Sequence, residues 1–403
     1  MKAYFISLGC PKNLTDTEVL MGKLTAAGHE VVKTPRQANI IIINTCAFLK
    51  TARDEALATI KEMAKWKSKG KKLYIAGCLP KYLNSSLVIS HSSLARLVDG
   101  EIDSIGLFNY CTPRLKATPP WYAYVKIAEG CNNYCAYCLI PRIRGKLRFR
   151  PAADVIAEIK GLAKRGVKEV ILIAQDTTAH PELPAILSGS ARVPGLKWLR
   201  LMYAHPAHLT EQVIDLIARE RKIVKYIDLP IQHACDKILR SMNRRYTRQD
   251  LEKLIVKIRR RKIALRTSVI VGFPGEGETE FRELLDFVRW AKFERLGCFT
   301  YQREKGTPAA KMREQVSPKI KIERFQKLMR AQARVTTNNM VGTIIPVLIE
   351  RGRAGRFVGR SYMDAPEIDG RVIVRAKNSI QPGEIVNVRV TKAAAYDLYG
   401  CLT

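Results

Sequence analysis

Apolar runs alternate with helical patterns along the first third of the chain. Residues 3–8, 39–44 and 72–76 are short and mostly apolar, which is typical of parallel strands buried on both faces. Residues 13–27 and 51–67 repeat their apolar positions at the spacing of an amphipathic helix. The pattern therefore predicts repeated strand–helix units and an open parallel sheet.

Three cysteines follow these three apolar runs. Cys10, Cys46 and Cys78 each stand just beyond the carboxyl end of a predicted strand. Short crossover helices require the strands to be parallel neighbours, so the three thiols should converge on the sheet edge where open α/β sheets hold ligands. This placement favours a three-thiolate metal site. The alternative is three unrelated buried thiols.

Beyond a Pro- and Thr-rich stretch at 112–120, which predicts a linker, strands and helices alternate again. The predicted strands cover residues 122–127, 169–174, 198–203, 225–229, 265–271 and 296–301, with a helix at 152–164. Six or seven strands with intervening helices predict an incomplete parallel (β/α) barrel. A helix over residues 318–335 leads into a strand-rich tail with Gly-rich turns, which predicts a small β-barrel.

The chain has 403 residues, which is too long for one ordinary core. We expect an α/β protein with domains at 1–118 (open sheet), 119–335 (partial barrel) and 336–403 (small barrel). No stretch has the length and apolar character of a membrane span or signal peptide, so we expect a cytoplasmic protein without a membrane partner. In a reducing compartment, ten cysteines favour metal ligation over disulfides.

The formal net charge is +32, and residues 119–335 carry most of the surplus. Such a field would attract a polyanion, or a particle built from one, with salt-dependent affinity. The alternative is a solvated, lysine-rich surface that aids solubility.

A second cysteine group has the spacing Cys-x3-Cys-x2-Cys, at Cys131, Cys135 and Cys138. Three thiolates can hold a cuboidal iron–sulfur cluster while leaving its fourth iron open, whereas electron-transfer clusters and structural zinc sites take four protein ligands. The motif, with Tyr137 just before its last cysteine, resembles the radical S-adenosylmethionine (SAM) superfamily. That resemblance implies the partial barrel, a 4Fe-4S cluster whose open iron chelates SAM, and a 5′-deoxyadenosyl radical that abstracts hydrogen.

Other cofactor contacts follow later strands. Gln175 and Asp176 stand where the superfamily commonly has a Gly-Gly-Glu motif that holds the methionyl amino group, and Asp176 is either the ammonium partner or a helix cap. Gly272 opens a turn that could present backbone to the adenosine, or be a turn without a ligand. Gln232 and His233 also follow a strand, although a lone histidine is more often a satisfied polar residue.

Basic residues recur at every second position after the cluster loop, at Arg142, Arg144, Lys146, Arg148 and Arg150. In an extended segment they would share one face near the active site, where they could bind a phosphate, a carboxylate or an acidic loop. The alternative is a solvated surface. We expect Cys111, Cys235, Cys298 and Cys401 to be ordinary thiols.

The combination of two three-cysteine groups with a strand-rich tail resembles the methylthiotransferases over essentially the whole chain. The resemblance implies a second 4Fe-4S cluster on Cys10, Cys46 and Cys78, which carries or donates sulfur. It also implies one SAM for methylation of that sulfur, another for the radical, and net insertion of a CH3-S group at a C–H position.

Within that family, residues 6–14, 226–233, 358–370 and 396–400 resemble the branch that modifies the β-carbon of an aspartate in ribosomal protein S12, and whose tail is a TRAM domain. The resemblance implies S12 or the small ribosomal subunit as substrate, with possible rRNA contact and a flavodoxin- or ferredoxin-type reductant. Two alternatives stay open: a tRNA-adenosine methylthiotransferase acting beside the anticodon, and a non-catalytic, metal-containing RNA-binding protein.

Overall fold

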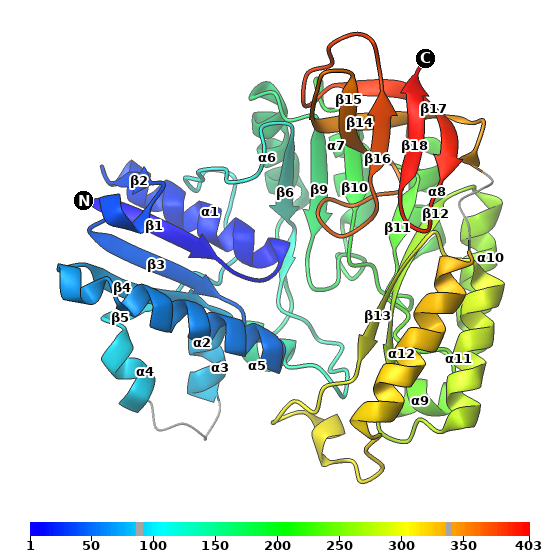
Figure 1. The fold of residues 1–403 in the computed structure, drawn as a ribbon, viewed down its shortest axis with the longest axis horizontal. Coiled ribbons are helices and arrows are strands. Elements are labelled where there is room, and N and C mark those ends of the chain that lie inside the picture. Colours follow the sequence, from blue (N-terminus) through cyan, green and yellow to red (C-terminus); the bar gives the residue numbers. More distant parts are fainter. Residues whose placement is uncertain (86–91, 336–339) are drawn as a thin grey trace.

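Three bodies lie in sequence order in the computed structural model, which describes residues 1–85, 92–335 and 340–403. An N-terminal parallel sheet packs beside a central half-barrel, and a small closed barrel sits on one end of that half-barrel (Figure 1). Among the described helices, none combines the length and the apolar character needed to cross a membrane.

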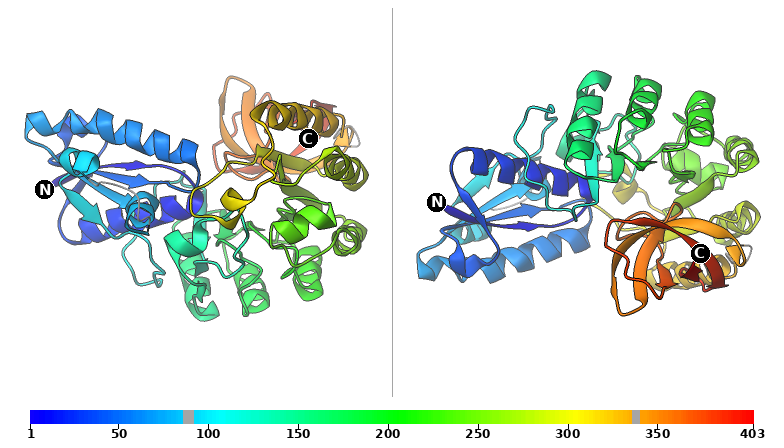
Figure 2. Two further views of the ribbon diagram at one scale, coloured as in Figure 1. Left: turned by 90° about the horizontal axis from the view of Figure 1, so that it is seen from below. Right: turned by 90° about the horizontal axis from the view of Figure 1, so that it is seen from above.

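The N-terminal sheet has the order β2-β1-β3-β4-β5, and all its neighbouring strands are parallel. Its elements are β1 (Lys2–Ser7), α1 (Pro11–Ala26), β2 (Glu30–Val32), β3 (Ile40–Thr45), α2 (Lys50–Ala64), β4 (Lys72–Gly77), α3 (Cys78–Ser85), α4 (Ser92–Leu97) and β5 (Gly100–Ile102). Helices α1 and α2 cover opposite faces of the sheet (Figure 2), and α1 also contacts the first central strand. Because both faces are covered, the central strand β3 reads as a continuous apolar run, as its sequence predicts.

Six parallel strands form the central half-barrel, as two three-stranded sheets that meet at a bridge between Leu199 and Ile223. The strands are β6 (Tyr122–Lys126), β9 (Glu169–Ile173), β10 (Trp198–Leu201), β11 (Tyr226–Asp228), β12 (Ala264–Val271) and β13 (Arg295–Thr300). The helices are α5 (Ile140–Arg144), α6 (Ala152–Lys164), α7 (Leu183–Ala191), α8 (Glu211–Arg219), α9 (Asp236–Ser241), α10 (Arg248–Arg260), α11 (Glu278–Ala291) and α12 (Pro318–Ala333). Most of these helices line the outside of the strands (Figure 2), so the predicted partial barrel is confirmed. A short antiparallel pair, β7 (Ala128–Glu129) and β8 (Arg148–Phe149), brackets the cluster loop and α5 in the chain.

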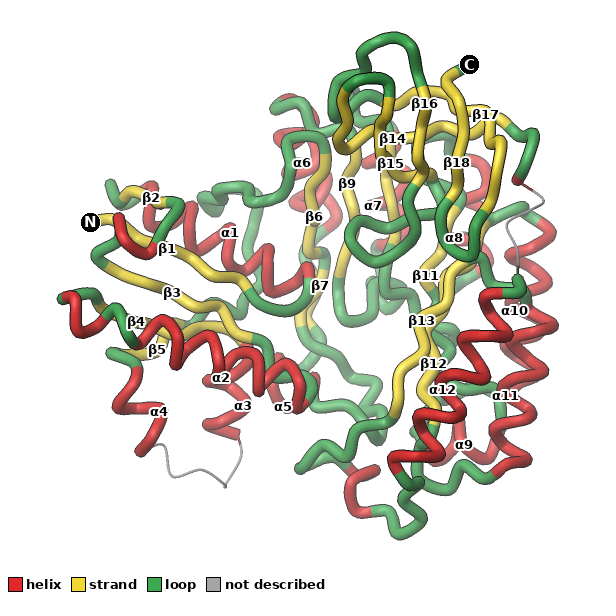
Figure 3. The backbone as a smooth tube through the Cα atoms, in the orientation of Figure 1, coloured by secondary structure: helices red, strands yellow, loops and turns green. Residues whose placement is uncertain are grey.

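The tail closes into a five-stranded barrel in the order β14-β15-β16-β18-β17, which confirms the predicted small barrel. Its strands are β14 (Ile344–Arg353), β15 (Arg356–Ser361), β16 (Val372–Arg375), β17 (Ile385–Ala393) and β18 (Leu398–Leu402). Figure 3 shows this barrel in the upper right of the view, where it overlaps β9 and β10.

Buried ion pairs hold the small barrel at the amino-terminal end of the central strands. Arg295, the first residue of β13, pairs with Asp364 at 2.5 Å. Arg360 pairs at 2.6 Å with Glu169, the first residue of β9. Because the barrel covers this end of the strands, the active site is expected at the opposite, carboxyl end, which is where (β/α) barrels carry their active sites.

Candidate functional site

The loop that carries Cys131, Cys135 and Cys138 follows β6 and β7 at the carboxyl end of the half-barrel. It begins at Gly130, whose φ is 81°, and a Cβ there would lie 2.2 Å from the carbonyl oxygen of Lys146. Only glycine can adopt this positive φ without a clash between a Cβ atom and the Lys146 carbonyl. The Cys131 amide donates to the Gly145 carbonyl at 3.2 Å, so the loop is closed at its base.

Each of the three sulfurs accepts an N–H group. The donors are the amides of Asn133 (to Cys131, 3.5 Å) and Ile140 (to Cys138, 3.4 Å) and the Arg244 guanidinium (to Cys135, 3.4 Å). Burial raises the pKa of the Cys131 thiol and raises that of Cys138 to about 12. In the absence of a metal, burial makes these thiols difficult to ionise, although each sulfur accepts an N–H group. A cationic metal centre would hold them as thiolates.

The predicted convergence of Cys10, Cys46 and Cys78 is confirmed as geometry. They follow β1, β3 and β4, which are adjacent parallel strands. A Cβ on Gly9 would lie 2.6 Å from the Cβ of Cys46 and 3.0 Å from its sulfur, so the Cys46 side chain lies directly against the residue before Cys10. Their role as metal ligands stays a prediction.

The three N-terminal thiols differ in electrostatic environment. Burial raises the pKa of Cys46, and it raises the pKa of Cys78 to about 12. Burial also opposes ionisation of Cys10, but the charges of Lys12 and Arg144 outweigh it and lower the pKa of Cys10. The charges of Lys12 and Arg144 therefore favour the thiolate at Cys10.

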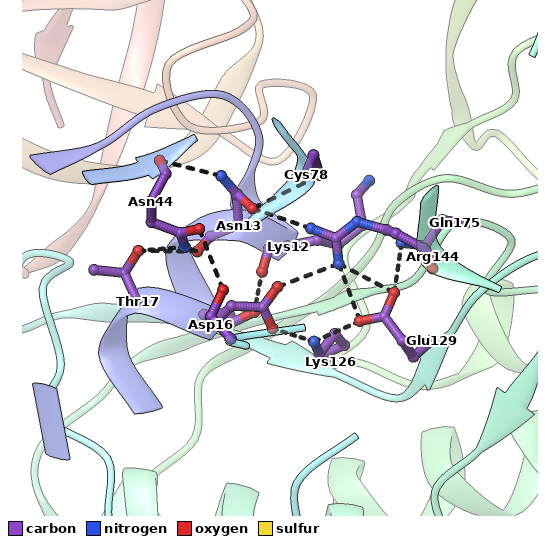
Figure 4. Close-up of polar contacts among 12 residues, drawn as sticks. Lys12, Asn13, Asp16, Thr17, Asn44, Cys78, Lys126, Glu129, Arg144 and Gln175 are labelled. Carbon is purple, nitrogen blue, oxygen red and sulfur yellow. Dashed lines mark hydrogen bonds and ion pairs between the residues drawn. The ribbon is translucent and has the colours of Figure 1, made fainter. Parts of the chain in front are cut away.

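A buried charge network joins helix α1, which begins directly after Cys10, to Glu129, two residues before Cys131 (Figure 4). Asp16 on α1 pairs with Lys126, and it lies 3.2 Å from Arg144. Glu129 pairs with the same two bases, at 2.6 Å and 3.0 Å. Arg144 also donates to Asn13 Oδ1 at 3.1 Å. Two acids balance two bases away from water, and this arrangement ties α1 to the half-barrel beside both cysteine groups.

The prediction that the alternating basic residues share an extended face is wrong. Residues 140–144 form α5, because the segment packs against α3 instead of running free, with Ile143 in the N-terminal core. Arg144 is buried in the charge network, and Arg150 is buried beside Asp154 and Glu158, at 2.6 Å from each. These two arginines are structural ion-pair partners and do not line a common surface with Arg148, which is exposed.

Gln175 and Asp176 follow β9, as predicted. Gln175 donates to Glu129 at 3.0 Å, and its buried Oε1 accepts no hydrogen bond from any described residue. Asp176 accepts from the side chains of Asn133 (2.8 Å) and His208 (2.7 Å). It also accepts from the Ala179 amide at 3.1 Å, so it caps the turn after β9. Through Asn133 and His208 it connects the cluster loop with the segment that follows β10. Their contacts with SAM stay predictions.

The other predicted cofactor contacts have defined places. The Gly272 amide donates to Glu276 Oε1 at 2.9 Å, so the turn is held internally. Gln232 has a φ of 66°, a strained value for a residue with a side chain and one that is frequent at functional sites. Tyr137 packs edge-on against Phe273, with ring centroids 6.4 Å apart. Whether they bind SAM stays a prediction.

Histidines near this face divide into two environments. His233 is fully buried, and its Nδ1 accepts from the Cys235 amide at 3.0 Å. Its Nε2 lies 3.3 Å from Glu276 but forms no hydrogen bond with any described residue, so the expectation of a satisfied polar residue holds for one ring nitrogen only. Burial, with Arg244 nearby, lowers the pKa of His205 to about 3. His205, His208 and Asp176 place donor atoms within 4.8 Å of one another. His205 Nδ1 already accepts from the Ala207 amide, which disfavours a metal bond from that nitrogen.

Sequence reasoning did not single out Asp16, Lys126 and Glu129 of the charge network, and it missed further residues of this region. Lys12 and Asn13 come directly after Cys10-Pro11, and their position at a helix start beside a ligand candidate was the available signal. Asn13 Nδ2 donates to the carbonyls of Leu8 and Thr45, which joins the ends of β1 and β3. Arg244 and His208 had no local signal, because Arg244 reaches Cys135 across 109 positions and His208 reaches Asp176 across 32.

Three family descriptions match the chain. The radical SAM superfamily matches residues 125–288, an uncharacterized protein family (UPF0004) matches residues 2–98, and the TRAM domain matches residues 341–402. A solved radical S-adenosylmethionine methyltransferase, TsrM from Kitasatospora setae, shares the fold with a TM-score of 0.56 and 14% identity. The similarity covers 76% of each chain.

Two curated relatives extend over the whole length. They are the ribosomal protein uS12 methylthiotransferases RimO of Lachnoclostridium phytofermentans and Geobacter sulfurreducens, with 41% and 42% identity. Each comparison covers 99% of this chain and at least 98% of the relative. This chain therefore belongs to the radical SAM methylthiotransferase family, in the branch of the ribosomal protein uS12 methylthiotransferases.

Proposed function

We propose that this enzyme methylthiolates the β-carbon of an aspartate in ribosomal protein S12. The observation that supports this most is the pair of three-cysteine groups on one junction, joined by the charge network of Asp16, Lys126, Glu129 and Arg144. The proposal that S12 is the substrate is supported by the relatives, which are named ribosomal protein uS12 methylthiotransferases. We further propose the domain limits 1–118, 119–335 and 336–403, which enclose the three family matches.

Each cysteine group has a donor set that fits a 4Fe-4S cluster with one open iron. We assign the radical-generating cluster to Cys131, Cys135 and Cys138, whose sulfurs accept N–H groups as cluster thiolates do. The auxiliary cluster is assigned to Cys10, Cys46 and Cys78. The chemistry that the bound cofactors supply is a deoxyadenosyl radical from one SAM and a sulfur methylated by another.

The chain's own residues bind, orient and shield these groups. The unpartnered Oε1 of Gln175 is a ready acceptor for the methionyl ammonium of SAM. Arg244 places a positive charge on the Cys135 sulfur, and hydrogen bonds to cluster sulfurs tune reduction potential. The small barrel blocks the amino end of the half-barrel, so substrate enters from the cysteine side. A flavodoxin- or ferredoxin-type protein is the proposed reductant, and the cytoplasm the proposed location.

A basic groove supports contact with rRNA around the substrate. The groove has a volume of about 1280 Å³ and lies among α10, α11, α12 and the small barrel. Eight of its lining residues are lysine or arginine and three are acidic; Arg282, Lys292 and Lys327 are among the basic ones. Such a surface attracts phosphate, and binding there would weaken steeply with salt.

The test is anaerobic incubation of the reconstituted enzyme with SAM, a chemical reductant and either free S12, small ribosomal subunits or tRNA. We expect about eight irons per chain, from two cubanes, and an S12 peptide heavier by one CH3-S group less one hydrogen. Mass spectrometry and nucleoside chromatography read the products. A methylthio nucleoside in tRNA with an unchanged S12 mass would overturn the proposal in favour of a tRNA-adenosine substrate. Faster modification of small ribosomal subunits than of free S12 at low salt concentration would support the rRNA contact.

A further inference from the structure

Lys12 reaches from the auxiliary cysteines into the central half-barrel. It is the second residue of α1, two positions after Cys10, and its side chain is 8% exposed. Its Nζ lies 3.3 Å from the centre of the Tyr203 ring and 3.5 Å from the carbonyl oxygen of Ala174. Ala174 and Tyr203 follow β9 and β10, so the ammonium group stands at the carboxyl end of the half-barrel, on the side of the cluster loop.

This ammonium group has no acidic partner among the described residues. Among the charges that act on it, Cys10 favours the ammonium form most, followed by Asp228 and Glu129, and neither carboxylate forms an ion pair with it. Asp228 accepts from Arg266 at 2.7 Å and from the Tyr203 amide at 3.0 Å. Glu129 is engaged by the two bases of the charge network. Both carboxylates are therefore committed elsewhere.

The contrast with Lys126 shows what Lys12 lacks. Lys126 is equally buried, at 5% exposure, and pairs with both Asp16 and Glu129. A buried ammonium group without a carboxylate is costly, and a cation–π contact and a long hydrogen bond replace only part of its lost hydration. The Lys12 ammonium group carries three N–H bonds and makes one long hydrogen bond, to the Ala174 carbonyl, among the described residues. A ligand carboxylate is thus expected to accept from its remaining N–H groups.

We infer that Lys12 binds the side-chain carboxylate of the substrate aspartate; this inference rests on the proposed function. The ammonium group belongs to the residue two positions after Cys10, and it stands at the ends of β9 and β10, in the same sheet as β6, which precedes the cluster loop. In aspartate the β-carbon is bonded directly to the carboxylate carbon, so an ion pair at Lys12 places that carbon between the two cysteine groups. The carboxylate of SAM has the same chemistry, and the experiment separates the two sources.

The experiment compares wild-type holoenzyme with Lys12→Met, Lys12→Arg and a control, Lys23→Met. Lys23 lies on the same helix, is exposed, and also stacks on an aromatic ring, that of Phe108, at 4.9 Å. Two ligands are titrated anaerobically: S12 with its target aspartate, and S12 with asparagine there. SAM binding is measured separately by equilibrium dialysis, and iron content shows that each variant has assembled.

Wild type and Lys23→Met should bind the aspartate form about ten- to a hundredfold more tightly than the asparagine form, as expected for a charged hydrogen bond in a buried site. Lys12→Met should bind both forms equally, Lys12→Arg should keep part of the preference, and SAM affinity should stay unchanged. A Lys12→Met enzyme that keeps the preference overturns the inference. If it instead loses SAM affinity, the carboxylate belongs to SAM. Failure of wild type to modify S12 at all would remove the proposed function, and the inference with it.

Discussion

Replacing Arg144 with methionine should lower the free energy of unfolding by about 3–5 kcal/mol, because it leaves a buried acid without its base. The guanidinium group lies 3.2 Å from Asp16, 3.0 Å from Glu129 and 3.1 Å from the Asn13 side-chain oxygen. Methionine keeps much of the apolar stem but carries no charge. Lys126 alone would then face two carboxylates that are fully buried, leaving one negative charge uncompensated.

The pKa of Glu129 gives an independent measure of the free energy that these ion pairs contribute. Burial alone would raise the pKa of this carboxyl, but Lys126 and Arg144 outweigh burial and lower it from 4.5 to about 2. Each pKa unit corresponds to about 1.4 kcal/mol, so the two bases contribute a net stabilisation of about 3 kcal/mol to the ionised carboxylate. Arg144 supplies a share of this and additionally binds Asp16, which brings the loss into the range above.

Urea unfolding of anaerobically prepared enzyme at neutral pH, followed by circular dichroism, measures the effect. The matched control is Arg142→Met, two residues earlier on the same short helix, where the arginine is exposed and donates to the Gly306 carbonyl. It should change stability by less than about 1 kcal/mol. The double variant Arg144→Met/Glu129→Gln restores the charge balance, so it should be more stable than the sum of the single changes by about 1.5–3 kcal/mol.

Two results would refute this reasoning. The first is an Arg144→Met protein within about 1 kcal/mol of wild type, which would mean that the buried carboxylates are compensated by some other route. The second is strict additivity of the double variant, which would mean that Arg144 and Glu129 do not interact energetically.

Four further substitutions test other parts of the molecule. Cys46→Ala should lower bound iron from about eight to about four per chain and leave deoxyadenosine formation measurable, whereas Cys135→Ala should abolish deoxyadenosine; iron analysis and chromatography read both. Ionised Glu129 stabilises the fold, so wild type should lose that stability as pH falls from about 4.5 towards 2, and Glu129→Gln should show a shallower acid transition by circular dichroism. Asp364→Ala should cost about 3 kcal/mol in thermal unfolding, because buried Arg295 loses its carboxylate.

Controls make these outcomes decisive. Cys111 is exposed, so Cys111→Ala should keep full iron, and iron loss there would point to a general effect of cysteine removal. Multiple turnovers of methylthiolated product by Cys46→Ala would contradict the auxiliary cluster. An acid transition of equal steepness in wild type and Glu129→Gln would contradict the depressed pKa of Glu129. Restoration of the Asp364→Ala stability by a second change, Arg295→Met, would confirm that the unpaired arginine is the cause.

The amino-acid sequence by itself determined the strand–helix order, the partial barrel, the small closed barrel and the placement of both cysteine groups. These features are local. Buried parallel strands appear in the sequence as apolar runs. Cys10, Cys46 and Cys78 each follow such a strand, so the order of the strands in the sheet is enough to bring the three cysteines together. The spacing of the cluster loop is likewise contained in nine residues, as is its required Gly130.

Only the tertiary structure decided how these parts meet. Arg144 looked like one member of a basic stripe, yet it bonds Asp16, 128 positions away, because α5 packs on α3 and turns its guanidinium inward. Lys12 meets the Ala174 carbonyl across 162 positions, and Arg360 meets Glu169 across 191. Local sequence patterns indicate which residues are apolar and where helices and strands end. They do not indicate which charged residue, far away in the sequence, will pair with a buried charged side chain. That depends on how the three bodies pack together, which produces both the charge network and a buried lysine, Lys12, that pairs with no carboxylate of the described residues.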